Sequence, residues 1–414
     1  MAHVATWSIA PCDVKEVSNS VEKTFQFERV GSCLSILNCK DYGDEGVLCA
    51  PSHVLVARYV AGACEAAWWC WSWSCQLVGA AALLGLAAWL LTIALDLLHP
   101  LRLVDRLHQR VVLITGCDSG FGEALARRLD SLGVPVVAGC LFPEGPGAQR
   151  LVQQCSSRLR VLPLDVTSEQ QVRDAVSSIR DSLDGRELWA LVNNAGMSDI
   201  GEAELVPLEV FERTLAVNTL GVVRVTQACL PLIRQAKGRI ITVASPLGRT
   251  AMPILSPYCM SKSAVISYCD ALRVEMKKWG VSVCTVEPSS YMSGLNNPDH
   301  FKATISKNFQ TRPLSVREAY GLDYDDKCTK SMSLLTFLAK RNPSIDKVIH
   351  ELVDACIGRY FQVRRIPGLW ERVVYVMLPQ LPYFETDIIN YLLLQWRMTV
   401  PPTAKSSEEQ NETH

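Results

Sequence analysis

The chain has 414 residues, which is long for one compact domain, and a net charge of −1. Hydrophobic residues make up 49% of it and charged residues 20%, so there is ample material for a large core. No run of Lys or Arg provides the basic surface of a nucleic-acid-binding protein, and we exclude that class. The 16 cysteines include no C-x-x-C pair and no zinc-ligand spacing with His. We therefore expect no metal site and reduced thiols that pack as small hydrophobic groups.

The role of residues 1–65 is open, but their acidic content argues against a mitochondrial transit peptide. Residues 66–98 are predicted to form a transmembrane anchor. No charged residue lies between Glu65 and Asp96, and four tryptophans between Trp68 and Trp73 resemble an interfacial aromatic belt. The alternatives are a buried core helix or a cleaved signal peptide, but the run lacks polar punctuation and starts too far from residue 1.

The residues that follow this span are basic. Arg102, Arg106 and Arg110 are opposed only by Asp105, which places the rest of the chain on the cytosolic side by the positive-inside rule. We expect the endoplasmic reticulum membrane, with a mitochondrial membrane as the alternative.

Short apolar runs then alternate with longer amphipathic stretches. This pattern predicts an α/β fold, a Rossmann-like doubly wound parallel sheet, as a single catalytic domain over residues 108–365. The expected strands are Val111–Thr115, Val134–Gly139, Arg160–Leu164, Trp189–Val192, Arg239–Val243 and Val281–Val286.

A glycine-rich loop joins the first strand to the helical run Glu123–Leu132. Glycines let the backbone approach a pyrophosphate, whose charge the helix N-terminus stabilises. The spacing G-x-x-x-G-x-G at a strand-to-helix turn therefore predicts a dinucleotide site. The loop residues expected to bind the cofactor are Thr115, Gly116, Asp118, Ser119, Gly120, Phe121 and Gly122.

The cofactor is expected to be NAD, with NADP less favoured. A 2′-phosphate needs an Arg or Lys in the glycine loop or at the end of the second strand, and neither place has one. Asp118 would repel such a phosphate. The usual ribose-binding acid at the strand end is also missing, and Glu144 is the nearest candidate.

Tyr258 and Lys262 are four residues apart and share one face of a helix. Ser245 lies upstream, at the end of the strand Arg239–Val243. Hydride transfer between an alcohol carbon and nicotinamide requires proton transfer at the oxygen, for which a phenol needs its anion stabilised. Lys262 and the cationic oxidised nicotinamide can supply that charge, and Ser245 can hold the substrate oxygen.

These motifs, in this order, are those of the short-chain dehydrogenase/reductase family, which the chain resembles over about residues 108–365. The resemblance implies that Lys262, with Tyr258, also contacts the nicotinamide ribose, and that Asn218 holds the water of a proton relay. It further implies that Asp165 and the adjacent Val166 lie at the adenine region, as do Asn193, Ala195 and Gly196. The family commonly forms dimers through the helices that carry Asn218 and Tyr258, so we expect a homodimer.

Within the family, the glycine loop is similar to that of type 2 hydroxysteroid dehydrogenases, retinol dehydrogenases and mitochondrial D-beta-hydroxybutyrate dehydrogenase. Leu230–Gly238 resembles the hydroxybutyrate enzymes, whereas Gly145–Ala148 resembles the hydroxysteroid enzymes. One departure follows the sixth strand, where the family usually has Pro-Gly and then a Thr. Here Pro288 is followed by Ser289, which restricts the backbone. Ser293 takes the place of the Thr at the nicotinamide amide.

The leading hypothesis is a membrane-anchored, NAD-dependent dehydrogenase that oxidises a secondary alcohol of a steroid or related lipid. Residues 366–400 would form an apolar cap or lie on the membrane, and the polar tail 401–414 is expected to be disordered. A second hypothesis is a 3-hydroxybutyrate or similar hydroxy-acid enzyme, whose substrate carboxylate would need a cation such as Lys302, Lys307 or Arg312. A third is an NAD-binding protein without turnover, which the complete set of Ser245, Tyr258 and Lys262 argues against.

Overall fold

The computed structural model describes residues 103–289, 291, 298–324, 328, 344–368 and 371–372, with a few separate residues between 71 and 87. The chain divides into two units, Met1–Asp96 and Leu97–His414. Of the predicted anchor, only separate residues such as Trp71 and Leu83 are described, and these are helical and exposed. The predicted segments 1–65 and 401–414, and nearly all of 366–400, lie outside the described residues.

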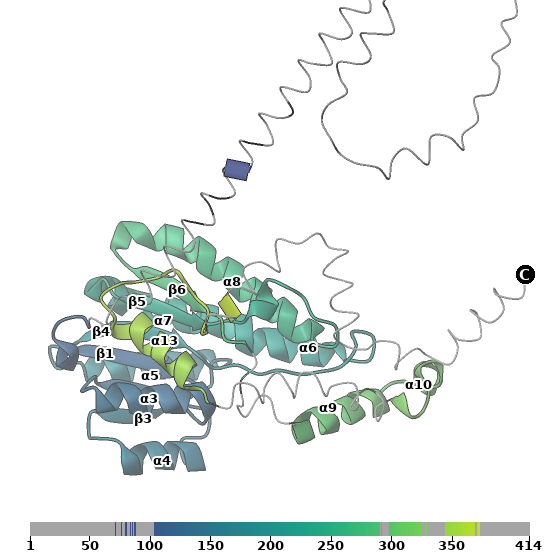
Figure 1. The fold of residues 1–414 in the computed structure, drawn as a ribbon. Helices are drawn as coiled ribbons and strands as arrows, with labels where there is room; N and C mark the ends of the chain where they lie inside the picture. The colour runs from purple at the N-terminus through teal and green to yellow at the C-terminus, as the bar shows by residue number, and fades with distance from the viewer. Residues whose placement is uncertain are drawn as a thin grey trace, which may run out of the picture. The chain divides into compact units, whose positions relative to one another are not determined.

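Seven parallel strands form one sheet in the order β3-β2-β1-β4-β5-β6-β7 (Figure 1). The order reverses between β1 and β4, and ligands of such sheets bind beyond the strand ends at this reversal. Six of the strands were expected from the sequence, whereas the seventh is only two residues long. The strands are β1 (Arg110–Thr115), β2 (Val136–Cys140), β3 (Leu159–Pro163), β4 (Glu187–Asn193), β5 (Arg239–Val243), β6 (Ser282–Val286) and β7 (Arg364–Arg365).

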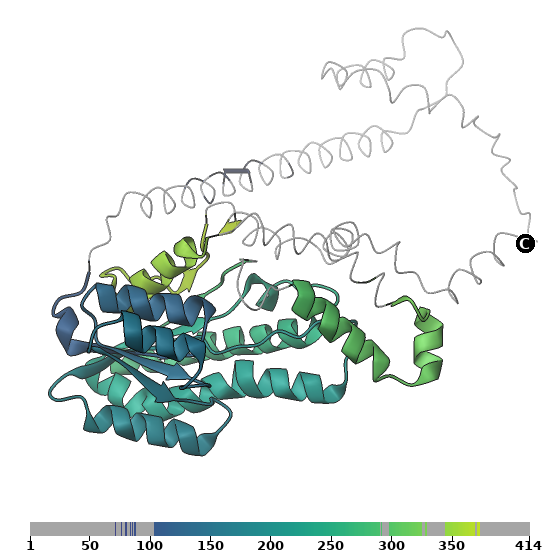
Figure 2. The same ribbon diagram turned by 90° about the horizontal axis from the view of Figure 1, so that it is seen from below.

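Helices cover both faces of the sheet (Figure 2). One face carries α3 (Gly120–Ser131), α4 (Pro146–Gln154) and α13 (Asp346–Ile357), and the other carries α5 (Glu169–Asp181), α7 (Val222–Ala236) and α8 (Ser256–Met276). Strand β1 shows why two layers form. Val112 and Ile114 pack into the first core while Leu113, pointing the other way, packs into the second.

A continuous helical stretch precedes β5. It consists of α6 (Leu208–Leu215), a π-helical turn η3 (Ala216–Gly221) and α7. Among the described residues, this stretch is long and apolar enough to cross a membrane by length and composition. However, Val225, Cys229 and Ile233 of α7 are buried in the same core as Leu191 of β4. The helix therefore packs on the sheet as a core helix does.

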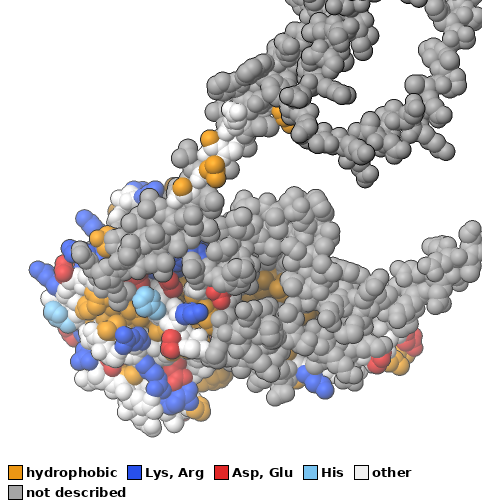
Figure 3. Space-filling model, viewed as in Figure 1, with side chains coloured by type: hydrophobic (Ala, Val, Ile, Leu, Met, Phe, Trp, Pro, Cys, Tyr) orange, Lys and Arg blue, Asp and Glu red, His pale blue; other side chains and the backbone are white. Residues whose placement is uncertain are grey.

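A third apolar cluster lies beside the sheet, where α9 (Pro298–Gln310) and α10 (Leu314–Tyr320) pack on the loop that follows β4. Asn308 of α9 donates to the carbonyl oxygen of Ile200 at 3.2 Å, and Tyr324 donates to Glu202 at 2.6 Å. These contacts fix the helices against the loop. On the face seen in Figure 3, acidic and basic side chains are interspersed over the described residues.

The cysteines of the described part of the chain are free, and all except Cys155 are buried. Burial raises the pKa of the Cys229 and Cys284 thiols to about 12. They therefore stay protonated and serve as small core side chains. Within the same residues, no group of three or more His, Cys, Asp or Glu side chains is placed to hold a metal ion.

Candidate functional site

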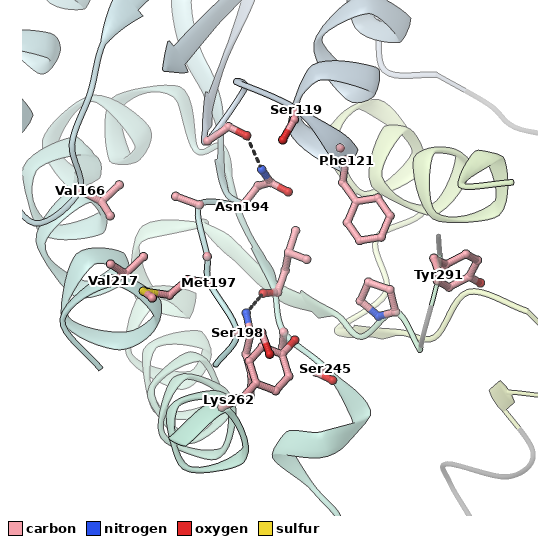
Figure 4. Close-up of a pocket in the computed structure, with 18 of the residues that line it drawn as sticks. Ser119, Phe121, Val166, Asn194, Met197, Ser198, Val217, Ser245, Lys262 and Tyr291 are labelled. Atoms are coloured by element: carbon pink, nitrogen blue, oxygen red, sulfur yellow. Dashed lines mark hydrogen bonds between the residues drawn. The ribbon is translucent and has the colours of Figure 1, made fainter. Parts of the chain in front are cut away.

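A cavity of about 570 Å³ opens at the carboxyl ends of β1, β4, β5 and β6 (Figure 4). Most of the site residues expected from the sequence line it. These are Gly116, Asp118, Ser119, Gly120, Phe121, Asp165, Val166, Ala195, Gly196, Ser245, Tyr258, Lys262 and Pro288. Thr115, Gly122, Asn193 and Asn218 lie behind its wall, and Ser293 lies outside the described residues.

The glycine loop needs glycine at several positions. Gly116 and Gly120 have φ of +71° and +63°, in the left-handed region that side chains disfavour. A Cβ on Gly122 would lie 2.2 Å from the carbonyl oxygen of Gly116, so the helix could not approach the strand as closely. Helix α3 starts at Gly120, and the Ser119 side chain does not cap it. The free N–H groups at this helix start fit a dinucleotide pyrophosphate.

Thr115 and Asn194 hold this loop against the end of β4. The Thr115 hydroxyl accepts hydrogen bonds from the backbone N–H groups of Asn194 and Ala195, each at 3.0 Å. The Asn194 amide donates to the carbonyl oxygens of Thr115 and Gly116, each at 2.9 Å. Asn194 lines the cavity, whereas Asn193 is buried and donates to the Thr226 hydroxyl. Of these two adjacent asparagines, the sequence interpretation chose the one that faces away.

The Asp118 carboxylate lies at the end of β2. Its oxygens accept the backbone N–H groups of Leu141 and Phe142 at 2.9 and 2.8 Å. An acid therefore occupies this strand end although the strand itself supplies none. Glu144, the candidate from the sequence, does not line the cavity. Among the described lining residues, Lys262 is the only Lys or Arg.

At the β3 end of the cavity, Asp165 and Val166 form part of the wall. The Asp165 carboxylate accepts hydrogen bonds from the backbone N–H and the hydroxyl of Thr167, at 2.8 and 2.7 Å. Arg224 of α7 donates to the Val166 carbonyl oxygen at 2.6 Å. This corner is therefore held firmly at the region expected for adenine.

Ser245, Tyr258 and Lys262 line the other end of the cavity, and Figure 4 labels Ser245 and Lys262 there. Ser245 follows β5 and caps a short 3-10 turn by accepting the Leu247 N–H at 3.2 Å. The Lys262 ammonium lies 5.6 Å from the centroid of the Tyr258 ring. The phenol and the ammonium share one face of α8, as their spacing predicts.

The electrostatics of this group are governed by burial. Burial raises the pKa of Tyr258 to about 12, and a hydrogen bond with Ser245 opposes this increase. Burial also lowers the pKa of Lys262 to about 8. The phenol is therefore protonated at neutral pH, and a proton-accepting phenolate requires additional positive charge.

Asn218 lies on the π-helical turn η3, a deviation that often occurs at functional sites. Its side-chain oxygen accepts the Met197 N–H, and its nitrogen donates to the Met197 carbonyl oxygen and to the Ser261 hydroxyl, at 2.9, 2.9 and 3.0 Å. The side chain thus joins the loop after β4 to helix α8. All its capacity to donate is used by protein partners.

The segment after β6 contains buried residues at or next to the cavity that the sequence pattern did not single out. Glu287 is fully buried and pairs with Arg249 and Arg364, and Tyr291 lines the cavity beside Pro288 and Ser289. An acid directly after a core strand was the available signal for Glu287. Its two partners are distant in sequence and could not be assigned.

The part of the cavity next to Ser245 is apolar. Leu247, Met252, Leu255 and Phe301 line it. Lys302 and Lys307 are exposed on α9, and neither they nor Arg312 are among the described lining residues. A carboxylate substrate would therefore meet no cation from these three side chains.

Comparisons with known proteins agree with this geometry. The family model for short chain dehydrogenases matches residues 110–300. Estradiol 17-beta-dehydrogenase 2 of Mus musculus is 36% identical over 290 residues, which cover 69% of this chain and 74% of that protein. The mitochondrial D-beta-hydroxybutyrate dehydrogenase of Rattus norvegicus is 39% identical over 257 residues, 61% of this chain and 74% of that protein.

A solved structure of a short-chain dehydrogenase from Streptomyces avermitilis is 21% identical and superposes with a TM-score of 0.51, covering 70% of this chain and 96% of that one. At this identity the likeness supports the fold alone. The relatives are dehydrogenases by name, and the family uses nicotinamide cofactors. The chain belongs to the short-chain dehydrogenase/reductase family and is an oxidoreductase that acts on CH–OH groups.

Proposed function

We propose that this protein is a membrane-anchored, NAD-dependent dehydrogenase that oxidises a secondary alcohol of a steroid or related lipid to the ketone. The observation that carries the proposal is the cavity itself. It has a glycine cradle at one end, Ser245, Tyr258 and Lys262 at the other, and an apolar wall beside them.

Ser245, Tyr258 and Lys262 have different roles at the substrate alcohol. The Ser245 hydroxyl hydrogen-bonds the substrate oxygen and holds it at the phenol. Tyr258 takes the hydroxyl proton as the hydride leaves the carbon, and returns it in the reverse direction. A nicotinamide held in this cavity would supply the hydride acceptor, and the positive charge of its oxidised form would favour the phenolate. The buried Lys262 ammonium adds positive charge and binds the nicotinamide ribose.

NAD is proposed over NADP because of the end of β2. The Asp118 carboxylate is held there by two backbone N–H groups, next to Leu141 and Phe142 in the cavity wall. A 2′-phosphate at that position would meet a negative charge and no basic side chain from the described wall. A ribose hydroxyl can instead donate to the carboxylate.

A lipophilic substrate is proposed because of the wall beside Ser245. Leu247, Met252, Leu255 and Phe301 bury apolar surface but provide no charge. The sequence of residues 66–98 suits a membrane anchor, and such substrates partition into bilayers. We further propose that the catalytic domain lies on the cytosolic side of the endoplasmic reticulum membrane, with a mitochondrial membrane as the alternative. The chain is proposed to form a homodimer.

The test is turnover by the full chain in detergent, followed by NADH fluorescence with a panel of steroid alcohols, retinols and 3-hydroxybutyrate. We expect activity with at least one lipophilic secondary alcohol and with NAD. Because the chain is similar to a D-beta-hydroxybutyrate dehydrogenase, a short hydroxy acid is the second candidate substrate. Activity with 3-hydroxybutyrate alone would replace the first proposal with the second.

A further inference from the structure

The segment that follows β6 is fixed at both ends. The Glu287 carboxylate accepts from Arg249 Nη2 at 2.8 Å and from Arg364 Nε at 2.9 Å. The Glu287 backbone N–H donates to the carbonyl oxygen of Arg365 at 2.8 Å. Further along, the Tyr291 hydroxyl donates to the Pro367 carbonyl oxygen at 3.2 Å. Ser289 lies between two anchored residues, so its place in the cavity wall is defined.

Tyr291, the second of these two anchored residues, also contacts the glycine loop. The rings of Tyr291 and Phe121 meet edge to face, with 6.2 Å between their centroids, and both residues line the cavity. The segment is therefore held against the same loop that cradles the dinucleotide. Figure 4 shows Phe121 and Tyr291 on the same side of the pocket.

Ser289 stands where the family usually has glycine, and the structure shows no backbone strain there. Positive φ occurs at Arg106, Asp184, Lys237 and Ile254 among the described non-glycine residues, and Ser289 is not one of them. The restriction expected from the sequence therefore has no conformational cost at this position. The substitution adds a hydroxyl to the cavity wall.

The Ser289 hydroxyl is a buried polar group whose hydrogen-bonding capacity is not used by the described residues. The Ser289 oxygen is buried, and it has no hydrogen-bond partner within the described part of the chain. A buried hydroxyl without a partner destabilises a folded protein, whereas a ligand that bonds to it gains affinity. Ser289 lines the cavity, and rotation about its Cα–Cβ bond, which requires no backbone movement, turns the buried hydroxyl toward a bound ligand.

We propose that the Ser289 hydroxyl hydrogen-bonds the carboxamide of the bound nicotinamide and acts as a binding residue particular to this chain. The inference rests on the proposed function, because hydride transfer at Ser245 and Tyr258 requires the nicotinamide to lie at this end of the cavity. The substrate oxygen already has Ser245 and Tyr258 as partners. A carboxamide offers both a donor and an acceptor, so either orientation of the hydroxyl is satisfied.

The test compares two ligands on one variant, Ser289→Ala. NADH carries the nicotinamide, and ADP-ribose lacks it. Calorimetric titration of the full chain in detergent should show that S289A weakens NADH binding about three- to tenfold, the effect of one neutral hydrogen bond, and changes ADP-ribose binding by less than about twofold. Ser289→Gly, which restores the residue usual in the family, should show the same selective loss.

The matched control is Thr214→Val. The Thr214 hydroxyl is also buried without a partner among the described residues, but it lies on α6 and does not line the cavity. This variant should bind both ligands as the unaltered chain does. Equal weakening of both ligands by S289A would indicate disturbed packing and overturn the proposal.

Two further outcomes would also overturn it. Unchanged NADH affinity with a raised KM for the alcohol would assign Ser289 to the substrate. An unaltered chain that binds neither ligand would refute both this inference and NAD dependence. Lack of turnover with every alcohol of the panel would count against the proposed substrate class only, because the binding comparison needs no substrate.

Discussion

The Lys262 ammonium donates a hydrogen bond of 2.8 Å to the carbonyl oxygen of Val243. Val243 is the last residue of β5, two positions before Ser245, so this contact ties the helix that carries Tyr258 to the strand that leads to the serine. Both residues are buried. The relative placement of the hydroxyl, the phenol and the ammonium is thereby fixed by the core of the fold, before any ligand binds.

Replacing Tyr258 with Phe should remove activity and preserve cofactor binding. The phenol moves the proton at the alcohol oxygen, a contribution of about 10²- to 10⁴-fold in rate, and its ring remains in the variant. Turnover is measured by NADH production, and NADH affinity by fluorescence titration. We expect the affinity to stay within a few-fold. A large loss of binding would mean that Tyr258 serves the cofactor instead of the reaction.

Tyr268→Phe is the matched control for this variant. Tyr268 lies on the same helix, burial likewise raises its pKa to about 12, and it does not line the cavity. Removing its hydroxyl should leave turnover close to that of the unaltered chain.

Lys262 should make the stability of the fold depend on pH. Because burial lowers its pKa to about 8, the folded chain releases this proton at lower pH than the unfolded chain, whose lysine has the ordinary value of 10.5. The unfolded state then binds more protons between these values, so the free energy of unfolding rises with pH, by at most about 1.4 kcal/mol per pH unit for one group. This contribution of Lys262 to the free energy of unfolding is complete above pH 10.5 and is lost as the pH falls through 8.

Urea unfolding at pH 7.5 and 9.5 tests this dependence. Lys262→Met should remove the rise, whereas Lys277→Met, at an exposed position directly after the same helix, should keep it. Tyr258 acts in the opposite sense, since its raised pKa contributes stability below pH 10 that is lost as the pH approaches 12. Identical pH dependence in all three proteins would show that Lys262 does not titrate in this range.

The sequence was sufficient for the parts of the fold that depend on local pattern. Strands β1 to β6 are apolar runs, and the residues of the glycine loop and of α8 have fixed spacing, so their positions in the cavity follow from the chain order. The seventh strand was not predicted, because two consecutive arginines, Arg364 and Arg365, have no apolar pattern. They pair with Thr285 and Val286 of β6 in parallel register.

Long-range partners were the other limit. Asn193 and Asn194 are the same residue type at adjacent positions, and only the packing of β4 decides which one faces the cavity. The burial of Glu287 depends on Arg249 and Arg364, which lie in separate parts of the chain. The free hydroxyl of Ser289 is likewise a property of its surroundings. Contacts of this kind depend on which segments pack together in the fold, so the local sequence pattern does not predict them.

Replacing Asp118 with Ala should relax the preference for NAD. The change removes a negative charge at the end of β2 and frees the N–H groups of Leu141 and Phe142, which can then donate to a phosphate. We expect the ratio of the NADP to the NAD dissociation constant to fall by about tenfold or more, equivalent to about 1.4 kcal/mol. Glu144→Ala is the control, because this exposed acid belongs to the same loop as Leu141 and Phe142 and does not line the cavity. An unchanged ratio for D118A would mean that cofactor selection resides elsewhere.

Glu287→Gln should destabilise the fold at the nicotinamide end of the cavity. The carboxylate is fully buried and accepts from Thr285 at 2.9 Å as well as from the two arginines. Breaking a buried ion pair costs about 3–5 kcal/mol, and the partial exposure of Arg249 and Arg364 reduces the expected loss to about 2–3 kcal/mol.

The measurement is the free energy of unfolding in urea. Glu169→Gln, which breaks the exposed pair with Arg173 on α5, should lose no more than about 0.5 kcal/mol. Because Arg249 follows the turn that Ser245 caps, E287Q should also lower kcat more than it raises KM. Equal, small losses of stability in the two variants would show that the buried pair does not hold this segment in place.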